Sequence, residues 1–350
     1  MKIQLSKNDK IYIMCPAKVK SGGPELLHQI GYVLRKIYKV KVYMLYYPRT
    51  SENPVNASYD SYNLPYIYCN DVEDNIGNIL IIPEIKPSLD LSSRFKKIRK
   101  CIWFLSVDNY YLFKMKKTDF FLKRFINELS GVVLNRPIYE LSLEKLIKRY
   151  PIEADCNIKK GNYFFTNSYR GFLFLKEKEI YPLFYLSEYL NEAFLNTKYY
   201  FNKKENIITY NPSKGFPFTR KIIKNAKGLK FIPLIDMDRS EIIKLLQKSK
   251  VYIDFGDHPG KDRLPREAAI MGCCVITGRR GSAAFFEDVP ILDEYKFDDK
   301  IENINKIIEK IKDCFENYPE RYKDFDYYRE IIKQEPKKFI EDIKNIFILQ

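Results

Sequence analysis

Long apolar runs are missing from this sequence of 350 residues, and none approaches the roughly 20 consecutive apolar residues that a membrane-spanning helix needs. The first ten residues, MKIQLSKNDK, also lack the apolar core of a signal peptide. These two absences argue against a membrane-spanning protein and against a secreted one. We therefore expect a cytoplasmic protein.

Cysteine and histidine are both scarce. The seven cysteines, at positions 15, 69, 101, 156, 273, 274 and 314, show neither zinc-ligand spacing nor a disulfide framework, so we expect buried free thiols in a reducing compartment. The only two histidines, His28 and His258, both fall in or beside glycine-containing loops. A lone histidine is usually structural, but this placement leaves a functional interpretation open for each of them.

Nucleic-acid-binding signatures are missing too, although the formal net charge is +15. No helix-turn-helix, zinc or RNA-recognition pattern is visible, so we expect no nucleic acid partner. The stretch from Tyr110 to Phe125 interleaves aromatic residues with lysine and arginine, as a segment in peripheral contact with an anionic membrane would. An amphipathic helix that packs on the core and exposes a basic side is the alternative.

The residues from Val251 to Asp288 carry the most information. An apolar strand, Val251 to Ile253, leads into a polar loop, and a helix is expected to open at Pro265. The loop and the helix start contain residues that permit close backbone approach and residues that are basic: Gly256, Pro259, Gly260, Lys261, Arg263 and Arg266. Close backbone, helix amides and cations together make an anion site. The sequence therefore predicts a phosphate ligand, and more particularly a diphosphate.

A second strand and turn of this kind lie upstream. The apolar strand Ile207 to Tyr210 breaks into the turn Asn211-Pro212-Ser213-Lys214-Gly215, which has a lysine at its tip. A basic helical stretch follows from Phe218. Lys214 either contacts an anion or is a solvated turn charge.

The N-terminal part repeats the order of strand, glycine turn, helix and strand. The strand Ile11 to Cys15 precedes Gly22 and Gly23, Pro24 is suited to the first helical position, and the strand Val42 to Tyr46 follows. This order implies a parallel sheet. Further strands are expected at residues 79–82, 101–105 and 163–168, and charged helices after residue 301, interrupted near Pro319 and Pro336.

The segment from Glu267 to Ile276, EAAIMGCCVI, resembles the E-A-M-A-x-G-x-P-V-I helix and strand of retaining GT-B glycosyltransferases of the GT4-like kind (glycosyltransferase group 1). Gly272 and the Val-Ile pair are in register with that pattern. The loop from Gly278 to Gly281 stands where those enzymes carry a glycine loop facing the donor. A helix start with Asp238 as N-cap and Glu241 three residues later precedes the segment, as in the nucleotide domain of that family.

The resemblance implies an α/β fold of two Rossmann-like domains facing a cleft. Residues 1–200 would form the acceptor domain and residues 201–334 the nucleotide-sugar domain. Residues 335–350 would form a terminal helix that crosses back to the first domain.

The resemblance also implies roles for individual residues. Lys214 would grip the donor diphosphate, and Glu267 would hold the nucleotide ribose. The family's first glutamate, eight residues before the second, is replaced by Pro259, so Asp254, Asp257 or His258 would take its work. The candidate catalytic residues are His28, Asp257 and His258. The candidate donor-binding residues are Gly22, Gly23, Asn211, Lys214, Gly260, Lys261, Arg263, Glu267, Gly281 and Ser282.

The expected function is transfer of a sugar from a nucleotide-sugar to a glycan or lipid-linked acceptor, as in lipopolysaccharide or capsule synthesis. The resemblance implies a retaining enzyme, with no cofactor beyond the donor and no metal, and no DxD motif is evident in a strand-end loop. Two alternatives remain open. One is a sugar-nucleotide epimerase of the same fold, and the other is a non-catalytic nucleotide-binding partner subunit.

Overall fold

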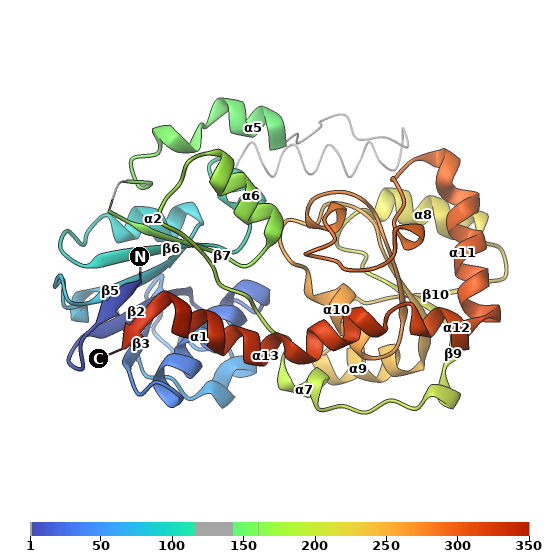
Figure 1. The fold of residues 1–350 in the computed structure, drawn as a ribbon, viewed down its shortest axis with the longest axis horizontal. Helices are drawn as coiled ribbons and strands as arrows, with labels where there is room; N and C mark the ends of the chain where they lie inside the picture. Colours follow the sequence, from blue (N-terminus) through green and yellow to red (C-terminus); the bar gives the residue numbers. More distant parts are fainter. Residues whose placement is uncertain (1, 116–142, 160, 350) are drawn as a thin grey trace. The chain divides into compact units, whose positions relative to one another are not determined.

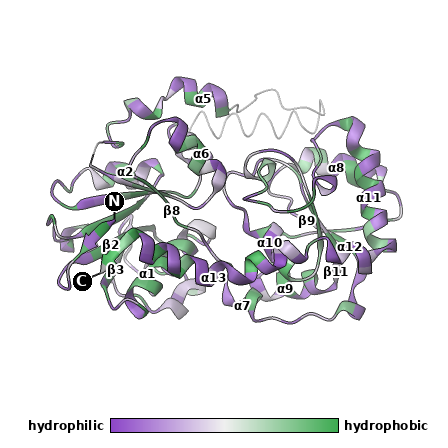
Figure 2. Ribbon diagram, viewed as in Figure 1, coloured by the Kyte–Doolittle hydropathy of each residue, from purple (hydrophilic) through white to green (hydrophobic). Residues whose placement is uncertain are grey.

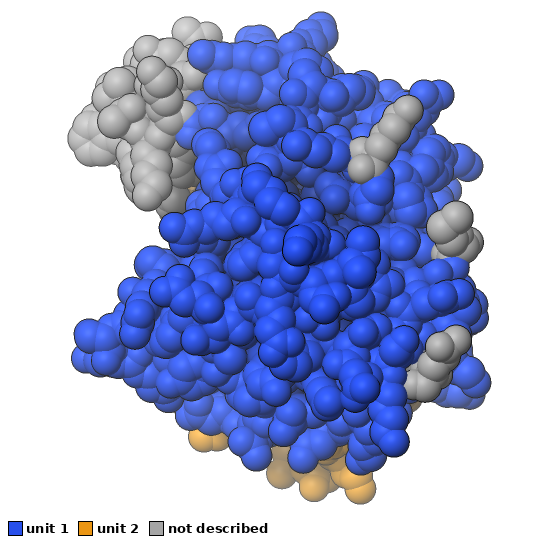
Figure 3. All heavy atoms as spheres, turned by 90° about the vertical axis from the view of Figure 1, so that its left-hand side faces the viewer, with its two compact units in different colours: residues 1–124, 140–188, 337–350 blue, residues 125–139, 189–336 orange. Residues whose placement is uncertain are grey.

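The computed structural model describes residues 2–115, 143–159 and 161–349. They divide into two compact units, which are coloured separately in Figure 3. Unit 1 contains the described residues up to 188 together with residues 337–349, and unit 2 contains residues 189–336. The chain passes from unit 1 to unit 2 after Glu188, whereas the domain boundary expected from the sequence lies near residue 200.

Unit 1 is built on a parallel sheet of seven described strands in the order β4-β3-β2-β5-β6-β7-β8. In this spatial order the strands are β4 (Tyr66–Ile67), β3 (Lys41–Tyr47), β2 (Lys10–Pro16), β5 (Ile79–Pro83), β6 (Arg99–Phe104), β7 (Tyr163–Thr166) and β8 (Leu183–Tyr185). The strands predicted in this part of the sequence are confirmed.

Helices follow the strands of unit 1 along the chain (Figure 1). They are α1 (Gly22–Lys36), α2 (Lys86–Ser92), α3 (Val107–Leu112), α5 (Leu143–Arg149) and α6 (Tyr169–Glu177). A separate parallel pair joins the two ends of the chain, β1 (Ile3–Leu5) and β13 (Phe347–Leu349). Strands covered on both faces are expected to be apolar throughout, and all five residues of β5 are buried. Figure 2 shows these strands mainly in green.

Unit 2 is built on a parallel sheet of four described strands in the order β10-β9-β11-β12. The strands are β10 (Lys230–Pro233), β9 (Glu205–Tyr210), β11 (Ser249–Asp254) and β12 (Cys274–Thr277). The helices are α7 (Glu192–Leu195), α8 (Phe216–Asn225), α9 (Arg239–Lys248), α10 (Arg263–Ile270), α11 (Ile304–Glu316), α12 (Tyr318–Lys323) and α13 (Asp326–Ile346). Helices α9 and α10 pack on the strands β9, β11 and β12, whereas α8 packs with α11.

Helix starts show where local sequence decides structure. The predicted cap of α9 is confirmed, because Asp238 accepts a hydrogen bond from the Glu241 amide and Glu241 accepts one from the Asp238 amide. Two other predicted starts are wrong: α1 begins at Gly22 rather than at Pro24, and α10 begins at Arg263 rather than at Pro265. Proline is tolerated throughout the first turn, because amides there have no partner inside the helix.

The predicted interruption near Pro319 is confirmed, since α11 ends at Glu316 and α12 begins at Tyr318. The predicted interruption at Pro336 is wrong, because α13 runs through it. Proline removes one helical hydrogen bond, but tertiary contacts hold the helix on both sides. Before the proline, Glu335 is buried and pairs with Lys261 and Arg266 of unit 2. After it, Phe339 is buried in unit 1.

The aromatic and basic stretch from Tyr110 to Phe125 lies only partly within the described residues, because residues 116–142 lie outside them. In the described part, the Tyr110 and Tyr111 side chains are buried, and Lys114 pairs with Asp155. These contacts agree with the core-packing interpretation for this part of the stretch. Across the described ranges, no helix has the length and apolar character needed to span a membrane.

The seven cysteines are free thiols, as predicted. Five of them are buried, Cys69 is half-buried and Cys156 is exposed. The expectation of burial is therefore correct for the cysteines in or beside core strands and helices and wrong for Cys156.

A buried lysine fixes the first strand of unit 2. Lys204, directly before β9, donates hydrogen bonds from its ammonium to the main-chain oxygens of Leu246, Ser249 and Met271, at 2.8, 2.8 and 2.6 Å. These oxygens lie near the end of α9, at the start of β11 and just after α10. One ammonium thus joins three segments of the unit.

We expect Lys204→Met to lower the free energy of unfolding by about 2 kcal/mol or more, because three buried carbonyl groups lose a charged donor. Urea unfolding followed by circular dichroism measures this. The matched control is Lys203→Met, which removes an exposed ammonium 4.9 Å from the ring of Tyr200 and should change stability by less than about 1 kcal/mol. Equal losses in the two variants would contradict the role of Lys204.

Candidate functional site

The carboxyl ends of β9 and β11 define the candidate site. These strands are neighbours, and their ends are aligned because Tyr210 pairs with Ile253. From β9 the chain moves outward to β10, whereas from β11 it moves in the opposite direction to β12. Ligands of open parallel sheets bind where the strand order reverses in this way, at the carboxyl edge.

Two glycines bring the loops after β9 and β11 into direct backbone contact. Gly215 has φ 62° and Gly256 has φ 112°, values that side chains rarely allow. A Cβ atom on Gly215 would lie 1.7 Å from the main-chain oxygen of Phe255, and one on Gly256 would lie 2.6 Å from the Gly215 nitrogen. Both positions therefore require glycine. The contact places Lys214 beside the end of β11.

The loop after β12 is fixed to the same place. The Ser282 amide donates a 2.8 Å hydrogen bond to the main-chain oxygen of His258, and Gly281 has φ 64°. A Cβ atom on Gly281 would lie 2.1 Å from that oxygen. Three loops thus converge on the backbone at Phe255 to His258.

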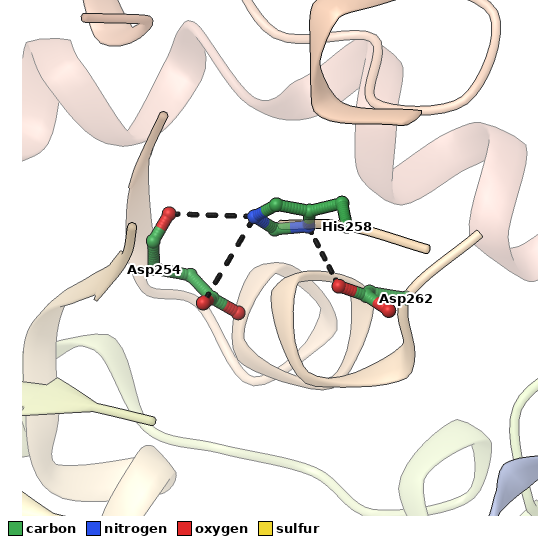
Figure 4. A group of neighbouring side chains, drawn as sticks. All are labelled: Asp254, His258 and Asp262. Atoms are coloured by element: carbon green, nitrogen blue, oxygen red, sulfur yellow. Dashed lines mark hydrogen bonds and ion pairs between the residues drawn. The ribbon is translucent and has the colours of Figure 1, made fainter. Parts of the chain in front are cut away.

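A histidine lies between two carboxylates at this convergence (Figure 4). His258 Nδ1 is 2.7 Å from Oδ2 of Asp262, and its Nε2 is 3.9 Å from Oδ1 of Asp254. His258 and Asp254 are buried, and the Asp262 side chain is 20% exposed. Asp262 has the N-cap position of α10, but its side chain does not cap the helix. It faces His258 instead.

The ammonium of Lys214 belongs to the same cluster. It contacts Oδ2 of Asp262 and lies 3.7 Å from Oδ2 of Asp254. The hydroxyl of Tyr252, on β11, donates a 2.7 Å hydrogen bond to the same Asp254 oxygen. We call these five residues, Tyr252, Asp254, His258, Asp262 and Lys214, the charged cluster.

The protonation of the charged cluster follows from burial and pairing. Burial raises the pKa of Asp254, although Lys214 and His258 partly oppose the rise. Burial also acts to raise the pKa of Asp262, but Lys214 and His258 outweigh it and the pKa is lowered. Burial acts to lower the pKa of Lys214, but Asp254 and Asp262 outweigh it and the pKa is raised. Lys214 and Asp262 are therefore a stable ion pair at neutral pH.

Another candidate cation is held away from this cluster. The Lys261 ammonium lies 2.8 Å from Oε1 of Glu335, whose other oxygen lies 3.0 Å from Nη1 of Arg266. All three side chains are nearly or fully buried. The loop before α10 is thereby attached to α13.

The remaining candidates of unit 2 lie in the loops that follow β9, β11 and β12 or in α10. Asn211 accepts a hydrogen bond from the Ser213 amide within its own turn. Asp257 is exposed and its carboxylate lies 3.5 Å from Nε of Arg280. The other candidates are Gly260, which is buried, Arg263, which begins α10, Glu267, which is half-buried one turn later, and Ser282, which is buried.

The candidates of unit 1 lie at the corresponding reversal of its sheet, between β2 and β5. Gly22 and Gly23 open α1 after β2. His28 is buried, with Nδ1 2.7 Å from the Pro24 oxygen and Nε2 2.7 Å from the Tyr46 hydroxyl. Burial lowers the pKa of His28. Both of its ring nitrogens are hydrogen-bonded inside unit 1.

His28 also supports the loop before α1. Its ring stacks on Tyr59 with centroids 4.5 Å apart, and the Tyr59 hydroxyl lies 2.9 Å from both the nitrogen and the oxygen of Ser21. This arrangement fixes the position from which Gly22 and Gly23 extend.

A buried carboxyl group stands on the other side of the same reversal. Glu84 follows β5 and accepts hydrogen bonds from the amides of Leu105 and Ser106 at 3.2 and 3.1 Å. Burial raises the pKa of Glu84 to about 8, although these amides oppose the rise. The group is therefore mostly protonated below that pH.

Several residues of the site were missed by sequence reasoning: Asp262, Tyr252, Asp299 and Glu335. Asp254, His258 and Asp262 follow one another at intervals of four residues, and this spacing could have indicated that their side chains lie together. Asp299 contributes from a distant segment, accepting a hydrogen bond from the Gly256 amide and pairing with Arg280 at 3.0 Å. No local pattern marks such a residue.

No protein-family model matches the chain, and no curated protein matches it in sequence. Solved structures share its fold. HepE from Anabaena, in complex with UDP and glucose, is 10% identical with a TM-score of 0.62, over 97% of this chain and 99% of HepE. Sucrose-phosphate synthase from Thermosynechococcus elongatus is 11% identical with a TM-score of 0.56, over 97% of this chain and 95% of the synthase.

A mutant of TarM from S. aureus, in a complex that contains UDP, is 14% identical with a TM-score of 0.52 over 79% of this chain. The match covers 57% of TarM, so this chain spans a little over half the length of that protein. These structures are GT-B glycosyltransferases. The α/β GT-B fold expected from the sequence is therefore confirmed.

We expect Glu84 to contribute a fall in stability as pH rises from 4.5 to about 8, because the folded state keeps the Glu84 proton that the unfolded state has lost. The contribution of this group is at most about 1.4 kcal/mol per pH unit. Urea unfolding across this range should show that Glu84→Gln removes this part of the slope. Glu177→Gln removes an exposed carboxylate and should show the same dependence of stability on pH as the native protein. An unchanged slope in Glu84→Gln would contradict the assignment.

Proposed function

We propose that this protein is a glycosyltransferase that uses a sugar-nucleotide donor and binds the donor at the carboxyl edge of the unit 2 sheet. The observation that carries the proposal is the convergence of three glycine loops where the strand order reverses. This convergence places a lysine ammonium near the start of an eight-residue helix. HepE and TarM share the fold and were solved with UDP, which supports a uridine diphosphate sugar as the donor.

The diphosphate would bind at the amino end of α10. Helix amides there point outward, and Arg263 and Lys214 contribute positive charge. Gly260 and Gly281 permit close approach of their backbones. Charge develops on the leaving diphosphate during transfer, and fixed cations and amides stabilise that charge without a metal ion. We therefore propose a metal-independent reaction.

The ribose would bind to Glu267, one turn into α10. A carboxylate can accept hydrogen bonds from two ribose hydroxyls at once. The next two residues, Ala268 and Ala269, are fully buried and fix this helix against its sheet. The orientation of Glu267 is therefore set by packing, as a specific contact requires.

The transfer step itself would depend on residues near Pro259, which stands where the family carries its first glutamate. We propose that Asp257, which is exposed, lies near the donor sugar, and that His258 positions the loop that carries it. His28 would act in the same way on the Gly22 loop of unit 1. Retention of the sugar's configuration is proposed from the sequence resemblance.

The acceptor would be a glycan or a lipid-linked sugar, handled by unit 1 in the cytoplasm at the inner face of the membrane. Synthesis of lipopolysaccharide or capsule is the biological setting proposed from the sequence resemblance. A membrane setting would also account for the aromatic and basic residues that follow Met115 in the sequence.

A non-catalytic nucleotide-binding subunit is favoured by one observation, the presence of Pro259 in place of the first glutamate. The two proposals differ in turnover. A protein that binds UDP-sugar without transferring, hydrolysing or epimerising it would be such a subunit. Formation of an epimer without acceptor would identify an epimerase.

The proposal predicts that uridine diphosphate and its sugar conjugates raise the melting temperature, because a ligand of the folded state alone stabilises it. A thermal-shift screen of nucleotides and sugar nucleotides measures this, and the shift should persist in EDTA. Failure of every nucleoside diphosphate to shift the transition would contradict the proposed site. A shift that needs an added divalent ion would contradict metal independence.

We expect Glu267→Gln to weaken binding of UDP and of UDP-sugars alike, by about 1 to 3 kcal/mol, because a ribose hydroxyl loses its acceptor. Calorimetric titration of the two ligands gives the comparison. Glu302→Gln, an exposed change elsewhere in unit 2, is the control and should leave both affinities unchanged. If Glu267→Gln keeps its affinity for UDP but loses turnover, Glu267 acts on the sugar and not on the ribose.

A further inference from the structure

We propose that Asp254, His258 and Asp262 form a cation site whose native occupant is the ammonium of Lys214, and that this site binds a divalent metal ion of the manganese or zinc class once that ammonium is removed. The proposal goes beyond the proposed function and does not depend on it. It would explain how the carboxylates beside the glycine loops are balanced by a cation without a metal.

The three side chains already have the arrangement of a ligand set. One donor atom from each lies within 4.8 Å of the others. Figure 4 shows Asp262 facing one ring nitrogen of His258 and Asp254 facing the other, so one ion held by both carboxylates would take only one of the two nitrogens. A metal with bonds of about 2.1 Å holds its donor atoms roughly 3 to 4 Å apart, so the three side chains would have to close around the ion.

The Lys214 ammonium lies within this set. It contacts Oδ2 of Asp262 and is 3.7 Å from Oδ2 of Asp254. A metal bound by the same carboxylates would occupy the space that the ammonium fills. The two cations are therefore alternatives rather than neighbours.

One ligand atom is left without a donor by the native arrangement. Oδ1 of Asp254 is buried and accepts no hydrogen bond from any residue in the described ranges. The Nε2 atom of His258 lies 3.9 Å from it, beyond hydrogen-bonding distance. Oδ2 of the same carboxylate accepts from Tyr252 at 2.7 Å. A carboxylate held by its second oxygen, with the first directed into the cluster, is ready to bind a cation.

Two features should favour metal binding when Lys214 is absent, the repulsion between the carboxylates and the fixed position of the loop. Two carboxylates would then face each other across an imidazole with no cation between them, which is unfavourable in a buried position. The loop cannot easily relax, because Gly256 packs on Gly215 and the His258 oxygen accepts a hydrogen bond from Ser282. A bound metal would relieve the repulsion without moving the backbone.

The ligand types select the class of metal. One imidazole nitrogen and two carboxylate oxygens suit manganese and zinc, whereas magnesium prefers oxygen ligands in octahedral geometry and keeps most of its water. Zinc and manganese are therefore the ions to test, and magnesium is the ion expected to bind poorly.

The experiment compares the full chain with its Lys214→Ala variant. Manganese chloride is titrated into each protein without nucleotide, free manganese is followed by electron paramagnetic resonance, and zinc chloride is titrated by calorimetry. We expect one ion per Lys214→Ala chain, with a dissociation constant at least about tenfold lower than for the native protein. Manganese should also raise the melting temperature of the variant and not that of the native chain.

Matched variants assign the effect. Lys214→Arg keeps a cation in the cluster and should bind no more metal than the native chain. Lys261→Ala removes a loop ammonium that pairs with Glu335 instead, and it should not create a site. Adding Asp262→Asn to Lys214→Ala should abolish the gain. Lys214→Met, which retains the length of the side chain, replaces Lys214→Ala if the alanine variant does not fold.

The result that overturns the proposal is a folded Lys214→Ala or Lys214→Met protein that binds neither ion more tightly than the native chain. Equal tight binding by the native chain would also overturn it, because the ammonium would then not be the occupant. Because nucleotide is absent, these outcomes are independent of whether the protein binds a sugar nucleotide.

Discussion

The contact between Gly215 and Gly256 is the constraint on which the rest of the site depends. Two loops from adjacent strands can touch through their backbones only where neither carries a side chain, and both glycines have positive φ. Once the loops touch, Lys214 lies beside Asp254 and can pair with Asp262. The position of the Lys214 backbone is thus decided by sterics, and the carboxylates then decide where its ammonium lies. Electrostatic attraction then holds a geometry that glycine has made possible.

The cations of unit 2 show that positive charge in a sequence is not the same as positive charge at a site. Lys214 pairs with Asp262, Lys261 with Glu335, and Arg280 with Asp299. For Lys261, whose side chain is nearly buried, a partner is required because its desolvation would otherwise be prohibitive, whereas Lys214 is partly buried and Arg280 is exposed. An anion at this sheet edge would therefore be bound by oriented amides and by cations that exchange a carboxylate partner for the anion. An excess of positive charge would contribute less.

Sequence patterns predicted the elements better than the contacts between them. The buried strand β5 is an apolar run, as is the middle of β11 from Val251 to Ile253, and the cap of α9 is a local exchange of hydrogen bonds, so these features are visible in a few residues. Asp262 was missed because its role depends on where the loop after β9 places Lys214. The break expected at Pro336 fails for a similar reason, since tertiary contacts outweigh one lost helical hydrogen bond.

Helix α13 links the contacts near the charged cluster to both units of the chain. Its first part belongs to unit 2 and its last part to unit 1, and the change occurs at Pro336. The residue before this proline, Glu335, pairs with Lys261 in the loop before α10 and with Arg266 in α10. The same ion pairs that neutralise the loop thus couple it to the helix that the two units share.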